Sequence, residues 1–248
     1  MMRQAMLQSI TQQFASLMIT FFSGMVIARL LSPREVGVYS VSWALVAIAV
    51  PLKEFGVSQF AISNDQVDDE LLSTAYGVSV LTSFIFMVLV FLLSWPAAAL
   101  YKSSDVGEVL KVIALSQITP LAVPATILLT HEMRFNALRN IAVIAGTCNA
   151  AVAISLAYFG WSSLGLALGY FSGNLVTVVC SILYKPKTIA LRPTLAGSGR
   201  LFSFGGWLTA STIVGTIGMQ VPELVIGRVL SLADAAFFSQ AGSSHDQP

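Results

Sequence analysis

The sequence predicts an all-α, polytopic membrane helix bundle with about seven transmembrane helices. Of its 248 residues, 56% are hydrophobic and only 10% are charged, and the mean hydropathy is +0.79, whereas soluble domains carry about 25% charged residues. Long uncharged windows separate the charged residues. No window alternates polar and apolar residues at period two, as a membrane β-barrel requires. We therefore expect the spans to be helices.

Each uncharged window is a candidate span, because a charge at the middle of a bilayer costs a few kcal/mol or more. A spanning helix needs about 20 residues. The fifth window is long enough for two helices, and a turn signal at residues 159–163 (FGWSS) divides it, which brings the total to seven. The windows cover residues 4–28, 36–52, 71–101, 112–130, 140–184 and 201–222.

Prolines adjust the ends of these helices. Pro96 is expected to end the helix of window 71–101 and to leave a short interfacial link. Pro120 and Pro124 stand one turn apart and predict a bend that faces protein, because the backbone carbonyls they free need partners. Glu223 follows a proline and is expected to end the last span.

The distribution of lysine and arginine predicts the orientation. With the N-terminus in the cytoplasm, eight of the thirteen basic residues lie inside, mostly in the connections 131–139 and 184–200, and five lie outside. The first apolar run is too long for a signal-peptide core and has no cleavage pattern, so we interpret it as an uncleaved span. Seven spans then place the C-terminal tail outside.

An internal repeat relates the two ends of the chain. Residues 26–40 align with residues 225–239 at an offset of 199, with six identities in fifteen positions. The first copy follows the first predicted span and the second follows the seventh, so six spans separate them. An even number gives a parallel repeat, with both units entering the membrane in the same orientation.

The repeat predicts how the chain is divided. Residues 1–199 form an N-terminal six-helix lobe, residues 200–240 hold the first helix of a second lobe, and residues 241–248 form a polar tail. A tail of this length is too short to span a membrane. We therefore expect the chain to be a truncated or partial form of a transporter nearly twice as long.

Short motifs along the chain resemble those of one transporter family. The segment 27–40 (IARLLSPREVGVYS) is similar to the motif after the first helix of the polysaccharide transporters, the oligosaccharide and O-antigen flippases of the multidrug/oligosaccharidyl-lipid/polysaccharide superfamily. Further similar motifs follow in order at residues 54–58 (EFGVS), 133–135 (MRF), 204–205 (FG) and 225–228 (VIGR). Each motif is weak alone, and their order and spacing together are fairly specific.

The resemblance implies a function and a location. Members have two six-helix lobes, and they flip lipid-linked oligosaccharide, typically on a polyprenyl diphosphate carrier, to the outer leaflet of the bacterial plasma (inner) membrane. These proteins act in the biosynthesis of cell-surface polysaccharide or lipopolysaccharide. The resemblance therefore implies two kinds of partner, membrane lipid and the proteins that assemble the polysaccharide. This chain departs from the family pattern because it lacks almost all of the second lobe.

Several other classes of function are excluded by composition. The net charge is +1 with no basic block, which argues against nucleic acid as a partner. Cys148 and Cys180 both lie in apolar runs, and we interpret them as small buried hydrophobes. The sequence holds no nucleophile motif, P-loop or metal-ligand spacing. We expect no catalytic residue, metal or cofactor, and therefore no enzyme.

A flippase must shield a diphosphate and polar sugars from hydrocarbon, so we look for polar groups at span ends and within spans. Arg29, Lys53 and Glu54 are the charged candidates, with Arg228 beside them. Arg29 and Lys53 have the alternative interpretation of snorkelling to the headgroups. The uncharged candidates within spans are Gln12, Gln13, Asn149, Asn174 and Gln220.

Glycines in the sixth predicted span indicate close helix packing. Gly165, Gly169 and Gly173 recur at every fourth position, which lets another helix approach. We expect the fifth span to be that helix, through the weaker stripe of Ala142, Gly146 and Ala150.

Three alternatives to the flippase remain open at this stage. A multidrug or organic-cation antiporter of the related branch would need buried carboxylates, and the predicted spans contain no Asp or Glu. A membrane glycosyltransferase or polymerase of the same pathway would need catalytic groups in a sizeable outer loop. A fragment with only a structural role is the third alternative.

Overall fold

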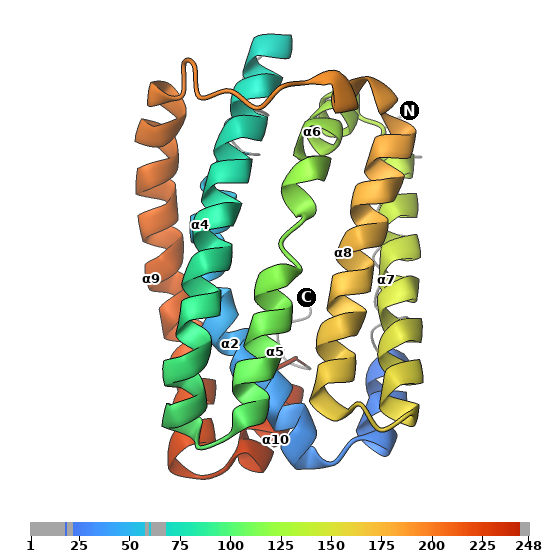
Figure 1. The fold of residues 1–248 in the computed structure, drawn as a ribbon, viewed down its shortest axis with the longest axis vertical. Coiled ribbons are helices and arrows are strands. Elements are labelled where there is room, and N and C mark those ends of the chain that lie inside the picture. The colour runs from blue at the N-terminus through green and yellow to red at the C-terminus, as the bar shows by residue number, and fades with distance from the viewer. Residues whose placement is uncertain (1–17, 19–21, 58–59, 61–67, 244–248) are drawn as a thin grey trace.

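The computed structural model describes residues 18, 22–57, 60 and 68–243. Within them the protein is an upright bundle of helices, with no strand among the described elements (Figure 1). The helices are α2 (Pro33–Glu54), α4 (Asp69–Tyr101), α5 (Ser104–Leu115), η1 (Thr119–Ala122), α6 (Val123–His131), α7 (Phe135–Tyr158), α8 (Ser162–Tyr184), η2 (Pro186–Ala190), α9 (Gly199–Val229) and α10 (Leu232–Ser243).

The all-α membrane fold predicted from the sequence is confirmed. Six segments of the described chain are long and apolar enough to cross a membrane. Most of the first predicted span, 4–28, lies outside the described residues, and its end is helical over residues 22–30. The six described spans are Pro33–Glu54, Asp69–Tyr101, Ser104–His131, Phe135–Tyr158, Ser162–Tyr184 and Gly205–Val229.

Two of the predicted interruptions are present. The turn at residues 159–163 divides α7 from α8, and Gly160 takes a φ of +83°, which glycine tolerates without strain. The predicted bend in window 112–130 is a complete break, because α5 ends at Leu115 and the chain continues through η1 into α6. Pro120 and Pro124 are buried there, as expected for a bend that faces protein.

Two predicted helix ends are wrong. Helix α4 runs through Pro96 to Tyr101, and α9 runs through Glu223 to Val229. Ending a helix inside the membrane would leave several backbone groups without partners, whereas continuing through a proline sacrifices only one hydrogen bond. The segment 200–240, expected to hold one helix of a second lobe, contains nearly all of α9 and most of α10, and α10 continues to Ser243 in the expected polar tail.

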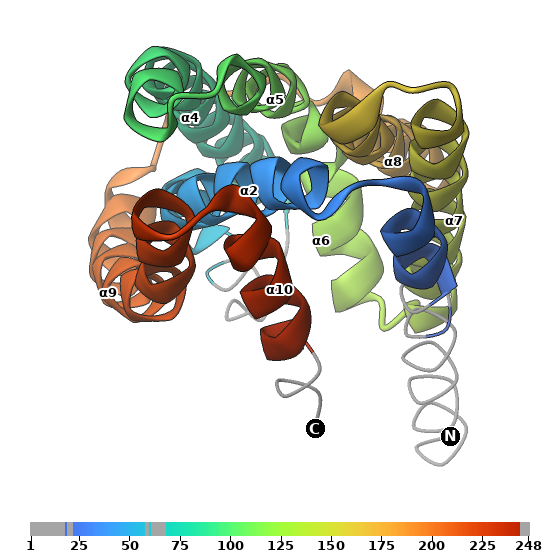
Figure 2. The ribbon, with the colours of Figure 1, turned by 90° about the horizontal axis from the view of Figure 1, so that it is seen from below.

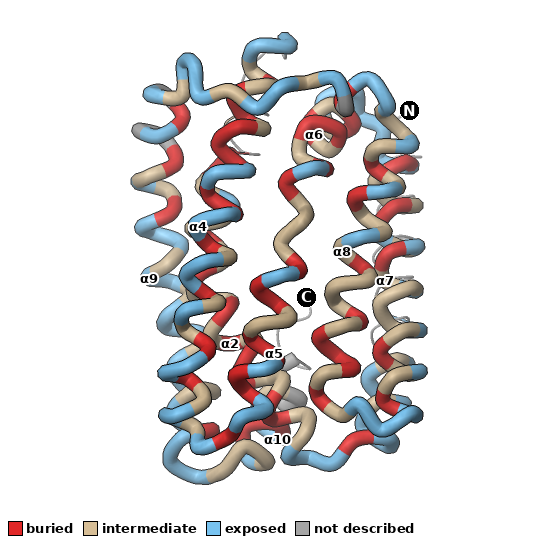
Figure 3. Tube along the Cα trace, viewed as in Figure 1, coloured by how far each residue is buried: buried red, intermediate tan, exposed pale blue. Residues whose placement is uncertain are grey.

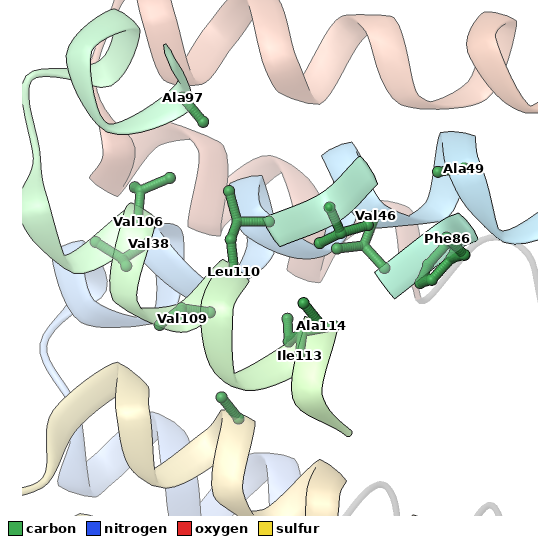
Figure 4. Packing of buried hydrophobic residues seen from close by; sticks show 12 residues of the cluster. Val38, Val46, Ala49, Phe86, Ala97, Val106, Val109, Leu110, Ile113 and Ala114 are labelled. Atoms are coloured by element: carbon green, nitrogen blue, oxygen red, sulfur yellow. The ribbon is translucent and has the colours of Figure 1, made fainter. Parts of the chain in front are cut away.

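Helix α2 is the centre of the bundle. It contacts α4, α5, α8, α9 and α10, and in Figure 2 it crosses between the α4–α5 group and the α9–α10 group. The largest apolar cluster joins α2 to α4, α5 and α8, with Val38, Phe86, Leu110 and Ile113 almost fully buried (Figure 4). Burying these side chains stabilises the packing that holds α2 in place.

The connection between α8 and α9 crosses one end of the bundle (Figure 1). The Thr194 amide donates to the carbonyl of Ser73 at 3.1 Å, and the Thr74 hydroxyl donates to the carbonyl of Ala196 at 2.8 Å. A Cβ added at Gly77 would lie 2.0 Å from the Thr194 carbonyl oxygen. The connection therefore rests directly on the backbone of α4.

Candidate functional site

A polar cavity lies where α5 breaks from α6. Its volume is about 400 Å³, and four parts of the chain line it: the end of α2, one face of α4, the η1–α6 segment and α8. The lining side chains are Lys53, Glu54, Val57, Ser79, Ser83, Thr119, Pro120, Ala122, Val123, Thr126 and Thr177. Hydroxyl and charged groups thus gather at the helix break.

The helix break creates this cavity. Buried Ser116 caps α5, and its hydroxyl donates to the carbonyl of Ile113 at 2.6 Å. The Asn174 amide of α8 donates to the carbonyl of Ser116 at 3.2 Å. Backbone groups freed inside a membrane need such partners, because no water replaces them in hydrocarbon. Asn174, a predicted site residue, therefore supports the end of α5 at the helix break.

Lys53 brings the cation to the cavity. Its Nζ donates to Oε1 of Gln117 at 2.9 Å, across the gap from α2 to the helix break. The Thr82 hydroxyl of α4 donates to the Lys53 carbonyl at 2.8 Å, so the last turn of α2 is held from two sides. A cation in the last turn of a helix also interacts favourably with the helix dipole. An ammonium group has three donors, so two remain available to a ligand.

The other lining groups are hydroxyls and one acid. Glu54 is exposed beside Lys53. The Thr126 hydroxyl donates to the carbonyl of Ala122 at the end of η1 at 3.0 Å, the Thr177 hydroxyl donates to the carbonyl of Gly173 at 2.9 Å, and both oxygens remain able to accept. The buried Thr119 hydroxyl has no hydrogen-bond partner within the described chain. The cavity therefore offers one ammonium and several hydroxyls to an anionic, hydroxyl-rich ligand.

The remaining predicted site residues lie elsewhere. Asn149 faces α8, and its Oδ1 would be 2.8 Å from a Cβ at Gly169. Arg29 and Arg228 are exposed, and Gln220 is partly exposed on α9. The prediction for Gln12 and Gln13 lies outside the described residues. The structure thus places Lys53 and Glu54 in the lining of the cavity and Asn174 at the end of α5, and it leaves the other candidates elsewhere.

The three glycines of α8 face α7 at close range. A Cβ added at Gly165 would be 3.1 Å from Cβ of Leu156, and one at Gly169 would be 2.7 Å from Cβ of Ala153. A Cβ at Gly173 would be 3.1 Å from Cβ of Asn149.

The expected counterpart stripe on α7 is wrong. Gly146 has nothing within 4 Å of its added Cβ. Ala142, Gly146 and Ala150 instead line a cavity of about 370 Å³ toward residues 23–27. The residues that meet the glycines of α8 are Ala145, Asn149, Ala153, Leu156 and Ala157.

Several motif glycines lie where α2 meets α9 and α10. A Cβ at Gly205 would lie 2.3 Å from the Phe55 carbonyl oxygen, so two motifs that are far apart in the sequence touch. A Cβ at Gly37 would lie 1.6 Å from the Leu232 carbonyl oxygen. One at Gly227 would lie 2.6 Å from a methyl group of Val41. Only glycine permits these three close approaches of helices.

The two copies of the repeat begin their helices in the same way. Ser32 caps α2, where its hydroxyl accepts from the Glu35 amide at 3.4 Å and the Glu35 carboxylate accepts from the Ser32 amide at 2.7 Å. Ser231 stands at the start of α10, and its hydroxyl accepts from the Asp234 amide at 3.1 Å. The equivalent residues therefore make equivalent caps, which supports the repeat.

These features define a class of protein: a multi-pass helical membrane protein with a polar cavity at a broken helix. A protein family described as "Polysaccharide biosynthesis protein" matches residues 26–248. The chain belongs to this family. The resemblance inferred from the sequence motifs is thereby confirmed.

Curated relatives agree with this assignment. The lipopolysaccharide biosynthesis protein WzxC of Escherichia coli is 27% identical over 226 residues, which are 87% of this chain and 44% of that protein. The succinoglycan biosynthesis transport protein ExoT of Rhizobium meliloti is 26% identical over 223 residues, 87% of this chain and 44% of that protein. A putative O-antigen transporter of Shigella flexneri is 23% identical over 230 residues, 86% of this chain and 54% of that protein.

This chain spans about half the length of these relatives. No solved structure matches it.

Sequence reasoning missed part of the cavity. Gln117, the partner of Lys53, and Thr119 are not among the predicted site residues. Their position beside a predicted break in a membrane helix could have identified them. Irregular backbone inside a membrane is tolerated only where it is buried in protein or lines a cavity. Within the described residues, no group of three His, Cys, Asp or Glu side chains is placed to hold a metal ion.

Proposed function

We propose that this protein acts in the translocation of lipid-linked oligosaccharide, carried on a polyprenyl diphosphate, to the outer leaflet of the bacterial plasma membrane. Membership of the polysaccharide biosynthesis family over residues 26–248 is the observation that carries the proposal. Relatives are named as transport proteins of succinoglycan and O-antigen. The N-terminus lies in the cytoplasm, and the product serves cell-surface polysaccharide or lipopolysaccharide synthesis.

The cavity at the α5–α6 break is the proposed binding site for the polar head of this lipid. A diphosphate needs a cation, and Lys53 supplies it with two unused donors. The lining hydroxyls, including that of Thr119, suit phosphate oxygens and sugar hydroxyls. Asn174 supports the end of α5 at the helix break, and Glu54 stands beside the cation. The chemistry is binding and release, so the protein acts without a cofactor, a metal or a catalytic residue.

Movement of the lipid requires two lobes that open alternately toward each side of the membrane. We assign residues 1–199 to the first lobe, 200–240 to the start of the second, and 241–248 to a polar tail. The repeat of residues 26–40 at residues 225–239, with its equivalent serine caps, supports this assignment. Arg29 and Asn149 lie outside the cavity and receive no role in binding the head group.

The test measures binding of a polyprenyl diphosphate-linked disaccharide by the full chain in lipid nanodiscs. Lys53→Met removes the ammonium, and we expect a loss of affinity of roughly 10- to 100-fold, because hydrogen bonds to charged groups contribute about 1.5–3 kcal/mol. Lys111→Met is the matched control, since Lys111 lies over the Trp95 ring at 5.6 Å and does not line the cavity. Its affinity should equal that of the unmodified chain.

Three outcomes would overturn the proposal. Equal losses of affinity in Lys53→Met and Lys111→Met would show that the cavity does not bind the substrate. Binding of an organic cation such as tetraphenylphosphonium, with no affinity for the diphosphate probe, would favour a multidrug antiporter. Formation of a new glycosidic bond on the probe would favour an enzyme of the same pathway.

A further inference from the structure

A second polar pocket lies at the opposite end of α2 from Lys53. Its volume is about 640 Å³, larger than the cavity at the helix break, and within the range of about 300–1,000 Å³ that is usual for small-molecule sites. Three parts of the chain meet there, the start of α2, the start of α5 and the α7–α8 turn (Figure 2). The predicted orientation places this end of the bundle outside the cell.

Glu35 is held in a fixed position at this pocket. One carboxylate oxygen accepts from the Ser32 amide at 2.7 Å and from the Ser32 hydroxyl at 2.8 Å. The other oxygen accepts from the hydroxyl of Ser162, at the start of α8. A carboxylate has about four acceptor sites, so Glu35 retains capacity for one further donor. The carboxylate is therefore oriented before any ligand arrives.

Arg34 and Asp105 add charged groups to the same pocket, and the Ser104 hydroxyl donates to the Asp105 carboxylate at 3.5 Å. Both are exposed, and neither forms an ion pair within the part of the chain that the structure describes. Asp105 comes from the first turn of α5, and Arg34 precedes Glu35 on α2. The pocket thus presents donors and acceptors from two different helices.

Trp161 provides an apolar surface beside these polar groups. It lies in the α7–α8 turn, where its amide donates to the Leu156 carbonyl at 3.0 Å and fixes its backbone. The side chain is 52% exposed. An indole ring combines a broad apolar face with a polar N–H, so it suits ligands that have both kinds of surface.

The charge balance selects among ligands. Two carboxylates, Glu35 and Asp105, face one guanidinium, so the pocket is negative overall and repels phosphate. A diphosphate or an anionic lipid headgroup is therefore disfavoured. A sugar ring fits, because its hydroxyls donate to carboxylates and accept from a guanidinium, while its C–H face packs on an aromatic ring.

We propose that this outer pocket, formed by Arg34, Glu35, Asp105, Trp161 and Ser162, binds a neutral or amino sugar residue. The role rests on the proposed function: the site would hold the sugar end of the oligosaccharide on the outer side, apart from the cavity that holds the diphosphate. The two sites lie at opposite ends of α2.

The test uses the full chain in nanodiscs with free sugars as probes, glucose, galactose and N-acetylglucosamine among them, and records saturation-transfer NMR. We expect millimolar binding by at least one sugar. Trp161→Ala and Asp105→Asn should each weaken it roughly fivefold, the size expected for one ring contact or one hydrogen bond. Trp161→Phe should retain most of the affinity because it keeps an aromatic face.

Trp207→Ala is the matched control, since Trp207 is 82% exposed on α9 and does not line the pocket. Binding that is unchanged in Trp161→Ala and Asp105→Asn would overturn the proposal, as would the absence of binding by every sugar. Glycerophosphoethanolamine, the headgroup of phosphatidylethanolamine, is the competitor. If it displaces bound sugar at a lower concentration than any competing sugar does, the pocket is a lipid site instead.

The failure of this proposal is distinguishable from failure of the proposed function. Free sugars carry no diphosphate, so the free-sugar probes and the diphosphate probe report on the two sites separately. If no free sugar binds while the diphosphate probe still binds, only the proposal for the outer pocket is wrong. If free sugars bind while the protein has no affinity for the diphosphate probe, the proposed function is wrong.

Discussion

The α7–α8 pair and α9 are all long apolar helices, yet they pack in opposite ways. A third of the most apolar window of α8 is buried, against 6% of that of α9, and Figure 3 shows α9 almost without buried residues over its middle. Glycines of α8 allow α7 to approach, whereas Gly215 and Gly218 of α9 have nothing within 4 Å. Small residues therefore create a packed interface only where another helix faces them.

This difference separates a closely packed pair from a helix that has an open face. In α9, Trp207, Val214 and Met219 are more than 70% exposed. Between the two lies α2, which contacts α8 on one side and α9 and α10 on the other. Changes in the α7–α8 pair should therefore act on folding, and changes at the α2–α10 contact should act on local mobility.

The largest effect is expected from Gly169→Leu. A Cβ there would be 2.7 Å from Ala153 and 2.9 Å from the Asn149 carbonyl oxygen, so the helices must separate. Overpacking of this kind costs about 1–3 kcal/mol or more. We expect a marked fall in the yield of monodisperse protein and in Tm, measured by size exclusion and thermal unfolding.

Gly215→Leu on α9 is its matched control and should keep both values near those of the unmodified chain. If the two variants behaved alike, the contrast between the helices would have no energetic basis.

A smaller, local effect is expected from Gly37→Ala. The added methyl would lie 1.6 Å from the Leu232 carbonyl oxygen, so α10 must move away from α2. Amide hydrogen exchange in α10 should rise while that in α7 and α8 stays the same. Gly206→Ala, which adds a Cβ with nothing within 4 Å, should leave all three helices unchanged. Faster exchange in α7 and α8 would show that the contact stabilises the whole bundle.

The smallest effect is expected from the two equivalent caps. Ser32→Ala removes an N-cap worth about 1 kcal/mol, which lowers Tm by roughly 2–4 °C in a chain of this size. Ser231→Ala should lower it less, because it affects only the peripheral α10. Thermal unfolding of the two variants measured side by side checks which has the lower Tm. A lower Tm for Ser231→Ala than for Ser32→Ala would show that the second copy of the repeat stabilises the bundle more than the first.

The sequence allowed the fold to be predicted well where a signal was local. The turn around Gly160 and the break around Pro120 were both visible as residue types at one place. Pro96 and Glu223 misled the prediction, because a proline or a charge was read as a helix end. Inside a membrane the need to pair backbone groups outweighs both signals.

The candidate site was predicted only in part, for the same reason. Lys53 stands out as a charge at the end of an apolar window, but its partner Gln117 lies 64 residues away and is identified only by the packing of the helices. Similarly, Gly146 and Ala145 are neighbours in the sequence and face about 100° apart on a helix. Periodicity shows that α7 has small residues and does not show which of them meets α8.

The connection between α8 and α9 limits how far the two can part. Its last anchor on α4 is the hydrogen bond from Thr74 to the Ala196 carbonyl, and α9 begins at Gly199. Three Cα steps span about 11 Å even when fully extended. While the hydrogen bond to Thr74 is intact, the start of α9 therefore stays within about 11 Å of Ala196, and so close to α4.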